Sequence, residues 1–388
     1  MSTPSAPSTR STPGDRSAVQ LPDKAVVLGS GAGALTTAVE LSGHGVAVTV
    51  ADLPQFSAGI VAIAAAGAVR MQCQWHGDQV APIAGTSTNP AAAIKGHQLI
   101  VVSVPSFGHK PFAELLAGAL TDGQQVLWVG EGGGALSLAT ALRRSGRRPA
   151  VEIAETNSLP YGARVKGPAL VSASRKSGGT VVAGLPPRSP LVGIANRIWP
   201  WVTPAQNVWE TVLLNFNAID HVPPIVCNLG TIEGRTSSML LWGEGATPAV
   251  ARVIEGIDNE LLAIRAALGI TNDVGYAQYL VQQGFAAEYK GSLYATLAAS
   301  AFASSVFPCG PEALKTRFIT EDVPYAQVLM SSLGAELAVP TPTIDAMITL
   351  ASIAAHTDFR AQGRTLADFD LAGVGRDGLL AAANDGWW

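Results

Sequence analysis

The segment AVVLGSGAGALTTAVELSGHGVAVTVAD, Ala25 to Asp52, predicts a β-strand, a glycine turn, a helix and a second strand. Gly29 permits a tight turn, and Gly31 lets a pyrophosphate approach the backbone closely. The N-terminus of the following helix offers free N–H groups and the positive end of its dipole to an anion. The segment therefore predicts the first unit of a nucleotide-binding parallel sheet.

The glycine motif is the GxGxxA variant, because Ala34 replaces the third glycine. Asp52 ends the second strand, where a carboxylate accepts the hydroxyls of the adenosine ribose and repels a 2′-phosphate. No Arg or Lys occurs between Leu53 and Val69, which favours NAD, whereas Ala34 leaves NADP open. Pro105 follows a later strand, and it either borders the nicotinamide or only shapes a turn. The predicted cofactor site comprises Gly29, Ser30, Gly31, Gly33, Ala34, Asp52 and Pro105.

Further short apolar runs alternate with helix-length segments, which indicates βαβ units and a Rossmann-type, doubly wound parallel sheet. Prolines cluster between Leu185 and Gln206, and beyond them the pattern becomes helical. We therefore expect an α/β plus α protein: a Ser/Thr/Pro-rich disordered tail at 1–22, a dinucleotide-binding domain at 23–205 and an all-helical domain at 206–388. The runs read as strands are AVVLGSG, VAVTVAD, LIVVSVP, QVLWVGE and PAVEIAE.

Composition favours a small-molecule partner. The 388 residues carry 14% charged side chains and a net charge of −4, which indicates neither nucleic-acid binding nor an acidic tail. No run is long and apolar enough to predict a membrane span, and the N-terminus lacks the apolar stretch of a signal peptide. The 3 cysteines are far apart, so we expect no metal site and a cytoplasmic location. The low charge also suits a homodimer.

One histidine stands out in NFNAIDHVPP, Asn215 to Pro224. His221 lies four residues after Asn217, so both side chains share one face of the predicted helix. The two prolines are expected to end that helix, and Asp220 is expected to face solvent because it points about 100° away from His221. Residue types alone leave His221 open as a catalytic group or a satisfied core side chain. His109 is similarly open, as a ligand contact or a buried residue.

The chain from about Lys24 to Gly373 resembles the octopine/nopaline dehydrogenase family, and within it the bacterial opine dehydrogenases. Members join an amino acid to a 2-oxo acid and reduce the resulting imine with NADH or NADPH. The resemblance therefore implies a cleft that binds an amino acid or amine and a 2-oxo acid. The resembling segments are LGSGAGA, ETNSLPYGARV (Glu155 to Val165), NFNAIDHVPP, TRFITEDVP (Thr316 to Pro324), VPTPTIDAMITLAS (Val339 to Ser352) and DFRAQGRTL (Asp358 to Leu366).

The resemblance also implies site residues. His221 matches the proton donor and acceptor of the family, and Asp322 matches its carboxylate partner. Such a pair suits proton transfer near neutral pH, because the carboxylate fixes the imidazole tautomer. Because opine products carry at least two carboxylates, the cleft should contain arginines. The substrate-binding residues implied in this way are Arg317, Arg164, Glu155 (for the ammonium), Asn217 and Tyr161.

Two other functions stay open. A simple 2-oxo acid or ketopantoate-type reductase shares this domain pairing but relies on a lysine of the second domain, where only Lys290 and Lys315 occur. A non-catalytic nucleotide-binding regulator is the third reading. Gly162 and Ala163 stand where relatives often carry a cysteine, which affects the predicted amino-acid substrate rather than the reaction.

Overall fold

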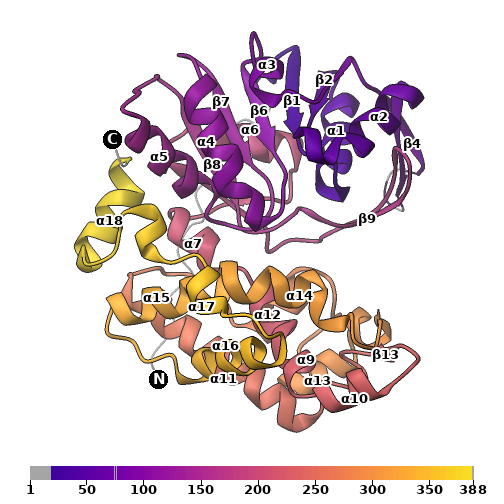
Figure 1. The fold of residues 1–388 in the computed structure, drawn as a ribbon, viewed down its shortest axis with the longest axis vertical. Coiled ribbons are helices and arrows are strands. Elements are labelled where there is room, and N and C mark those ends of the chain that lie inside the picture. Colours follow the sequence, from indigo (N-terminus) through magenta and orange to yellow (C-terminus); the bar gives the residue numbers. More distant parts are fainter. Residues whose placement is uncertain (1–18, 74, 76, 387–388) are drawn as a thin grey trace, which may run out of the picture.

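A computed structural model describes residues 19–73, 75 and 77–386. The chain forms two halves, an α/β half and a helical half (Figure 1), which confirms the predicted fold class. Most of the tail expected at 1–22 lies outside the described residues. Val19 and Leu21 are described, and both pack against the core of the α/β half, so ordered chain extends further toward the N-terminus than expected.

The α/β half is built on an eight-stranded sheet in the order β12-β11-β8-β7-β6-β1-β2-β5. All five predicted strands are present as β1, β2, β6, β7 and β8 and pair in parallel. At one edge β11 runs antiparallel to β8. The strands are β1 (Lys24–Leu28), β2 (Ala47–Ala51), β5 (Gly85–Ser87), β6 (Leu99–Val102), β7 (Gln125–Trp128), β8 (Glu152–Thr156), β11 (Val181–Leu185) and β12 (Thr203–Pro204).

Helices cover both faces of this sheet because alternate strand residues point to opposite sides. Ala25 and Val27 of β1 share one core with α1 and α6, whereas Val26 and Leu28 share the other with α4 and α5. These helices and two short ones are α1 (Ala32–Gly43), α2 (Ser57–Ala66), α3 (Pro90–Ala93), α4 (His109–Ala119), α5 (Gly134–Ser145) and α6 (Leu191–Ile198).

A second, four-stranded sheet in the order β4-β3-β10-β9 extends the α/β half, and the sequence analysis did not predict it. Its strands are β3 (Ala68–Cys73), β4 (Gln79–Pro82), β9 (Tyr161–Gly167) and β10 (Leu170–Arg175). In Figure 1 β9 runs along the lower edge of this half and faces the helical half. The loop after β10 contacts the helical half, because the Ser177 N–H donates to the Gln283 carbonyl oxygen at 3.0 Å.

The helical half follows β12, and it contains one small two-stranded sheet, β13 (Met239–Leu240) with β14 (Val306–Phe307). A π-helical turn at Asp322–Gln327 joins α14 to α15. The helices are α7 (Val208–Leu213), α8 (Asn217–Asp220), α9 (Val222–Val226), α10 (Leu229–Gly234), α11 (Pro248–Ala267), α12 (Tyr276–Gln282), α13 (Leu293–Ala298), α14 (Arg317–Thr320), α15 (Val328–Glu336), α16 (Pro342–Ala354), α17 (Phe359–Gln362) and α18 (Gly375–Asp385).

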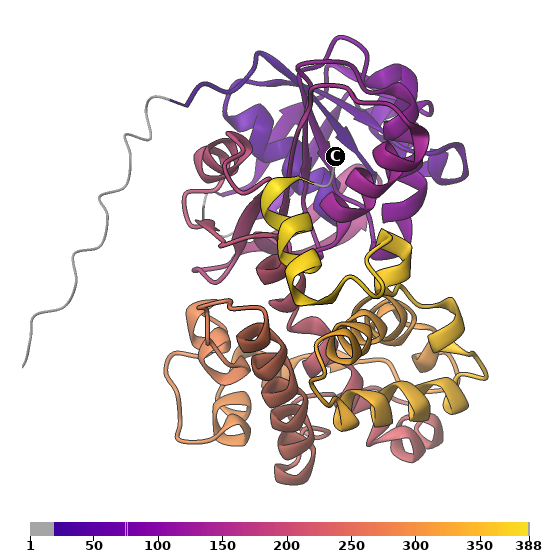
Figure 2. The ribbon, with the colours of Figure 1, turned by 90° about the vertical axis from the view of Figure 1, so that its left-hand side faces the viewer.

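The C-terminal segment returns to the α/β half, as Figures 1 and 2 show for α18. Trp209 of α7 donates from Nε1 to the Leu379 carbonyl at 2.7 Å. Arg144 of α5 binds Asp370 at 2.7 Å. The domain division at residue 205 stays a prediction, and the last segment of the chain packs across it. No helix of the described part is long and apolar enough to span a membrane.

Candidate active site

The glycine turn after β1 has the geometry that a pyrophosphate site requires. Gly29 has φ 114°, and a Cβ there would lie 2.4 Å from the Ser103 carbonyl oxygen, so only glycine fits. A Cβ at Gly31 would meet nothing within 4 Å, so the turn is open at that position. No side chain caps the N-terminus of α1, which leaves its first N–H groups free for an anion.

The other predicted cofactor residues support this turn. A Cβ at Gly33 would lie 2.5 Å from Ser103 Oγ, and Ala34 is fully buried, so both residues allow α1 to pack closely. Ser30 Oγ donates to Asp52 Oδ2 at 2.6 Å, and the Leu53 N–H donates to Oδ1 at 2.8 Å. Burial raises the pKa of Asp52, and these hydrogen bonds oppose the rise. Two bonds leave the carboxylate further acceptor sites for a ribose.

Pro105 lies where the predicted nicotinamide site meets the helical half. It follows β6 and precedes a 3-10 turn at Ser106–Gly108. The Ser106 N–H donates to Glu321 Oε1 at 2.7 Å, and its hydroxyl donates to Glu131 Oε2 at 2.6 Å. This loop therefore links the carboxyl end of the sheet to the segment that carries Asp322.

His221 and Asp322 meet across 101 positions of sequence, with Nδ1 2.7 Å from Oδ2. The imidazole stacks on Phe318, with ring centroids 3.7 Å apart and an interplanar angle of 9°. The helix that carries Asn217 ends before the prolines, as expected, because α8 stops at Asp220; a second helix then begins at Val222. His221 joins α8 to α9, and Pro223 and Pro224 lie in the first turn of α9, where their missing N–H groups cost nothing.

Two carboxylates that the sequence analysis missed support Asp322. Glu131, in the loop after β7, hydrogen-bonds the Asp322 carboxyl. Glu321 is buried, and it receives Arg317 on its second oxygen. Burial and the neighbouring Glu321 raise the pKa of Asp322 well above its ordinary range, and burial raises the pKa of Glu131 to about 8. Glu131 in GEGGG could have been found as a carboxylate at the carboxyl end of a parallel strand.

The expectation that Asp220 faces solvent is also wrong. Its side chain is buried, and Oδ2 accepts a hydrogen bond from the Tyr276 hydroxyl at 2.5 Å. Oδ1 lies 3.6 Å from His221 Nε2. The helix periodicity placed it away from His221, but Asp220 ends a four-residue helix, and α12 packs over the side expected to be open. His221 therefore has a carboxylate near each ring nitrogen.

Burial is the main influence on His221. It lowers the pKa of the imidazole because the charged form loses water. The negative Asp220 and Glu131 oppose this shift, whereas the positive Arg164 and Arg317 add to it. Both arginines therefore lie close enough to act on the ring, although one comes from β9 and the other from α14.

Two of the predicted substrate-binding residues, Glu155 and Tyr161, are buried and hydrogen-bond other groups of the protein. Glu155 is fully buried, with Oε2 accepting from the Gly133 and Ala135 N–H groups and Oε1 from Thr211. It anchors the start of α5, so an ammonium cannot reach it. Tyr161 is also buried, and its hydroxyl lies 2.6 Å from Thr37 Oγ1 on α1. The structure thus gives both residues supporting roles instead of substrate contacts.

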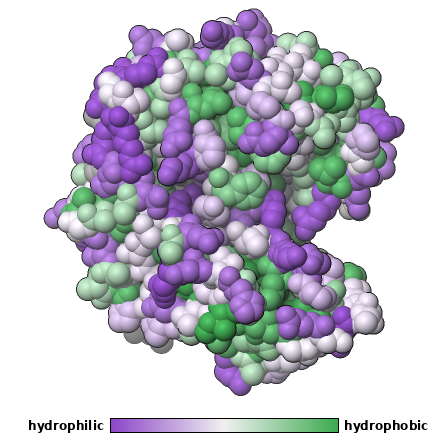
Figure 3. Space-filling view, viewed as in Figure 1, coloured by the Kyte–Doolittle hydropathy of each residue, from purple (hydrophilic) through white to green (hydrophobic). Residues whose placement is uncertain are grey.

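The remaining predicted substrate residues are accessible. Arg164 and Asn217 are exposed, and the Arg317 side chain retains 65% of its accessible surface. Figure 3 shows the molecule hollowed between its halves, on the side where β9 lies opposite α14 in Figure 1. Because Asn217 is exposed, it is not a buried packing amide. Lys290 and Lys315, which a ketopantoate-type mechanism would need, pair instead with Glu288 and Glu312 on exposed surface.

His109 belongs to the core. It is buried, and Arg364 donates to its Nδ1 over 3.1 Å. Burial and the positive Arg364 lower the pKa of His109 well below its ordinary value, so the ring is neutral. Arg364 also donates to the carbonyl oxygens of Gly132 at 3.1 Å and Tyr325 at 2.8 Å, which joins the two halves.

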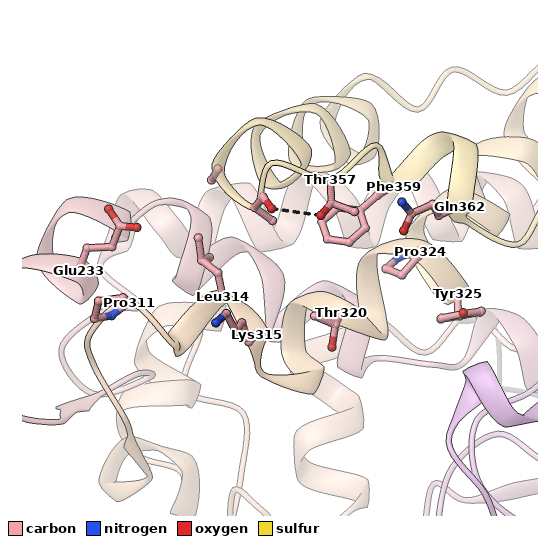
Figure 4. A pocket seen from close by; sticks show the side chains of 12 residues that line it. Glu233, Pro311, Leu314, Lys315, Thr320, Pro324, Tyr325, Thr357, Phe359 and Gln362 are labelled. Atoms are coloured by element: carbon pink, nitrogen blue, oxygen red, sulfur yellow. Dashed lines mark hydrogen bonds between the residues drawn. The ribbon is translucent and has the colours of Figure 1, made fainter. Parts of the chain in front are cut away.

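A separate pocket of about 460 Å³ lies within the helical half, behind the turn that carries Asp322. Figure 4 shows Lys315, Thr320, Pro324 and Tyr325 on one side of it and Thr357, Phe359 and Gln362 on the other. Neither His221 nor Asp322 lines it, so we do not assign the reaction to this pocket. Among the described residues no cluster of His, Cys, Asp or Glu has the geometry of a metal site.

Comparison with known proteins points to one group of enzymes. Residues 204–355 match the family described as "NAD/NADP octopine/nopaline dehydrogenase, alpha-helical domain". The chain is 31% identical over 293 residues to an opine dehydrogenase of Arthrobacter sp. (strain 1C), which covers 75% of this chain and 80% of the relative.

Solved structures share the fold. An octopine dehydrogenase with NADH and L-arginine has a TM-score of 0.76 at 17% identity, over 92% of this chain and 98% of the other. A yersinopine dehydrogenase with NADP+ has a TM-score of 0.72 at 14% identity, over 94% and 98% of the two chains.

Proposed function

This chain belongs to the octopine/nopaline dehydrogenase family and is an NAD(P)-dependent oxidoreductase of the opine dehydrogenase type; we propose that His221, supported by Asp322, is its acid–base group. The observation that carries this assignment is the 2.7 Å contact between Nδ1 and Asp322 Oδ2. It leaves Nε2 as the ring nitrogen for substrate.

The reaction needs proton transfer at two points. The amine nitrogen attacks C2 of the 2-oxo acid, and the resulting carbinolamine loses its hydroxyl as water to form an imine. Addition of a hydride to the carbon of the C=N bond and of a proton to its nitrogen then gives a secondary amine with at least two carboxylates. The bound nicotinamide supplies the hydride. His221 donates the proton that the departing hydroxyl needs, a task that suits an imidazole near neutral pH.

Asp322 and Glu131 hold His221 ready for this step. Asp322 fixes the tautomer with the proton on Nδ1 and stabilises the imidazolium once it forms. The hydrogen bond between the Glu131 and Asp322 carboxyl groups requires a shared proton, which the raised pKa of Glu131 provides. The two carboxyl groups hold this proton between them, which keeps Asp322 in position at Nδ1 of His221.

We assign the carboxylate of the 2-oxo acid to Arg317 and Arg164. Both guanidinium groups are exposed, and both act electrostatically on His221. A guanidinium matches a carboxylate through two parallel hydrogen bonds. Asn217, exposed one turn before His221, is a further hydrogen-bonding group for substrate.

We propose NAD as the preferred cofactor, with NADP as the alternative. The Asp52 carboxylate lies at the end of β2, and its two internal hydrogen bonds hold it there. A negative charge at this place favours a ribose hydroxyl over a 2′-phosphate. From the composition we also propose that the protein is cytoplasmic and forms a homodimer. Light scattering after size-exclusion chromatography would test the homodimer.

The proposed reaction can be tested with purified protein, NADH or NADPH, a set of L-amino acids, and pyruvate, glyoxylate or 2-oxoglutarate. We expect oxidation of the reduced cofactor only when an amine and an oxo acid are both present, with a secondary amine detected by mass spectrometry. His221→Ala should lower kcat by roughly 10²- to 10⁴-fold. His356→Asn is the control, because His356 is exposed and asparagine tolerates its φ of 47°. Equal oxidation with an oxo acid alone would indicate a simple reductase.

A further inference from the structure

Two oppositely charged groups have no role assigned so far: Asp220, from α8 beside His221, and Lys176, from the loop after β10. The loop that carries Lys176 reaches the helical half, where the Ser177 N–H donates to the Gln283 carbonyl oxygen at 3.0 Å, and the negative charge of Asp220 acts on Lys176. Both residues belong to the described part of the chain, yet no ion pair joins them there. The two charges are therefore held apart.

On the helical side, Asp220 keeps one oxygen unused. Tyr276 binds Oδ2, whereas Oδ1 has no hydrogen-bond partner among the described residues. The side chain retains 5% of its accessible surface, so little water reaches this oxygen in the structure as it stands. A buried carboxylate oxygen without a donor is costly, and a bound cationic group would satisfy it.

On the opposite side, Lys176 is partly buried, and its Nζ donates to Ser158 Oγ at 2.8 Å. An ammonium has three N–H donors, so two remain. Burial lowers the pKa of Lys176 to about 8, and the charge of Asp220 opposes this shift. The group is still largely charged near neutral pH and can bind an anion.

Building on the proposed function, we propose that Asp220 and Lys176 together recognise the α-amino acid substrate. Asp220 Oδ1 receives the α-ammonium group, and Lys176 Nζ receives the α-carboxylate. An α-amino acid carries these opposite charges on two groups bonded to the same carbon atom, Cα, so an anionic and a cationic side chain near each other complement it. Arg164 and Arg317 then remain free for the 2-oxo acid.

This placement also suits the chemistry. Only a neutral amine can attack the oxo acid, so the ammonium must first lose a proton. Asp220 accepts that proton as the N–H bond breaks, which leaves a neutral carboxylic acid and an amine with a free electron pair. Burial raises the pKa of Asp220 to about 6, which makes it a better base than an exposed carboxylate. His221 Nε2 lies 3.6 Å from Asp220 Oδ1, so an amine bound at Oδ1 lies beside Nε2.

The experiment compares amino acids with the amines that lack only the carboxylate. L-Arginine with agmatine and L-phenylalanine with phenethylamine are suitable pairs. Binding to the protein saturated with NADH is measured by calorimetry, and turnover with pyruvate by steady-state kinetics. The variants are Lys176→Met and Asp220→Asn, with Lys166→Met and Asp377→Asn as controls, because Lys166 is exposed and Asp377 is almost fully exposed.

We expect the wild type to favour at least one amino acid over its amine by about 10- to 100-fold, the usual effect of a charged hydrogen bond. Lys176→Met should remove that preference and leave the KM of pyruvate unchanged. Asp220→Asn should lower kcat with both members of a pair, because both carry the ammonium. Tyr276→Phe keeps the packing and removes the hydrogen bond to Asp220 Oδ2. It should weaken amine binding less than Asp220→Asn does.

The assignment would be overturned if Lys176→Met still preferred the amino acid over the matching amine. It would also be overturned if this variant raised the KM for pyruvate without losing that preference. Equal wild-type binding of amino acids and amines would overturn it as well. These outcomes differ from failure of the proposed reaction, in which no pair with an oxo acid oxidises NADH or NADPH while calorimetry still reports amino-acid binding.

Discussion

At the scale of single residues, the imidazole of His221 is held on all sides. Asp322 binds Nδ1, Asp220 lies near Nε2, and Phe318 covers one face of the ring. Only 14% of the side-chain surface remains accessible. A ring fixed in this way loses little entropy when it meets the substrate, so its proton is presented in one direction.

The tautomer of His221 can be tested by replacing Asp322. Asp322→Asn keeps the shape but removes the charge that stabilises the imidazolium, so kcat should fall by about 10²- to 10⁴-fold. The KM values should change far less. Steady-state kinetics with the best substrate pair would measure this, and a kcat within twofold of the wild type would rule out the supporting role.

Glu131 should make stability depend on pH. Its pKa is raised from 4.5 to about 8 in the folded protein, so between these values the folded state holds a proton that the unfolded chain has released. The contribution of Glu131 to the free energy of unfolding should therefore fall as the pH rises from 4.5 to 8, by up to about 5 kcal/mol. Glu131→Gln should flatten this slope in urea titrations. An equally steep slope in the variant would contradict the assignment.

Asp52 should control cofactor choice. Asp52→Asn removes the negative charge at the ribose site, so kcat/KM for NADPH relative to NADH should rise by about 10-fold. The neutral amide can still accept from Ser30, so folding should be retained. Kinetics with both cofactors would test this; an unchanged ratio would mean that other residues discriminate.

The sequence allowed several of these residues to be predicted and concealed others. The link between His221 and Asp322 could be predicted only from the resemblance, because no spacing rule brings together residues 101 positions apart. Asp220 was misplaced because ideal helix angles do not describe a helix of four residues. Glu155 was misassigned because a strand-end carboxylate can serve a substrate or a neighbouring helix, and only the structure distinguishes these roles.

At the scale of elements, the π-helical turn Asp322–Gln327 positions the acidic partner of His221. Gln327 is fully buried at its end, and its Nε2 donates to the Ala218 carbonyl of α8 at 2.8 Å. One hydrogen bond thus ties the segment carrying Asp322 to the helix that precedes His221. Wider turns of this kind often occur at functional sites.

Removing the hydrogen bond between Gln327 and the Ala218 carbonyl should lower both stability and activity. Gln327→Leu keeps the volume but leaves the Ala218 carbonyl unpaired, so the free energy of unfolding should fall by about 1–3 kcal/mol. We also expect a lower kcat, because the distance between His221 and Asp322 is then less fixed. Gln362→Leu is the control, since Gln362 is exposed. Urea denaturation and kinetics measure both effects; unchanged values for Gln327→Leu would show that the tie is dispensable.

The strands of the large sheet could be predicted more readily than those of the small one. Buried parallel strands such as β6 are continuous apolar runs, LIVV in this case, and stand out in any sequence. In β9 only the first and third residues, Tyr161 and Ala163, are buried, so its pattern resembles a loop. The small sheet was missed for this reason, although it carries Arg164 and leads to Lys176.

At the scale of the whole molecule, Arg364 is a buried residue that connects the halves. Its guanidinium donates to Gly132, Tyr325 and His109. Arg364→Met would leave these acceptors unpaired, so the free energy of unfolding should fall by roughly 2–5 kcal/mol. Arg252→Met, at an exposed position, should change it by less than about 0.5 kcal/mol. Urea denaturation would measure both free energies. Equal effects of the two variants would show that the hydrogen bonds of Arg364 between the halves do not stabilise the protein.

The change of pattern at the proline cluster predicted two parts, and the family resemblance implied a cleft. They could not predict that the chain would return, because the segment after Leu366 has no feature that distinguishes it from other helical sequence. The contact between Arg144 and Asp370 depends on a fold that brings together residues 226 positions apart.

This return changes how the halves can move. Two bodies joined by one connection can swing and twist about several axes. Here the backbone crosses from one half to the other near residue 205 and again before Asp370, so two pivots define a single line of rotation. Rotation about this line would change the width of the space between the halves, and with it the separation between Asp220 in the helical half and Lys176 in the α/β half.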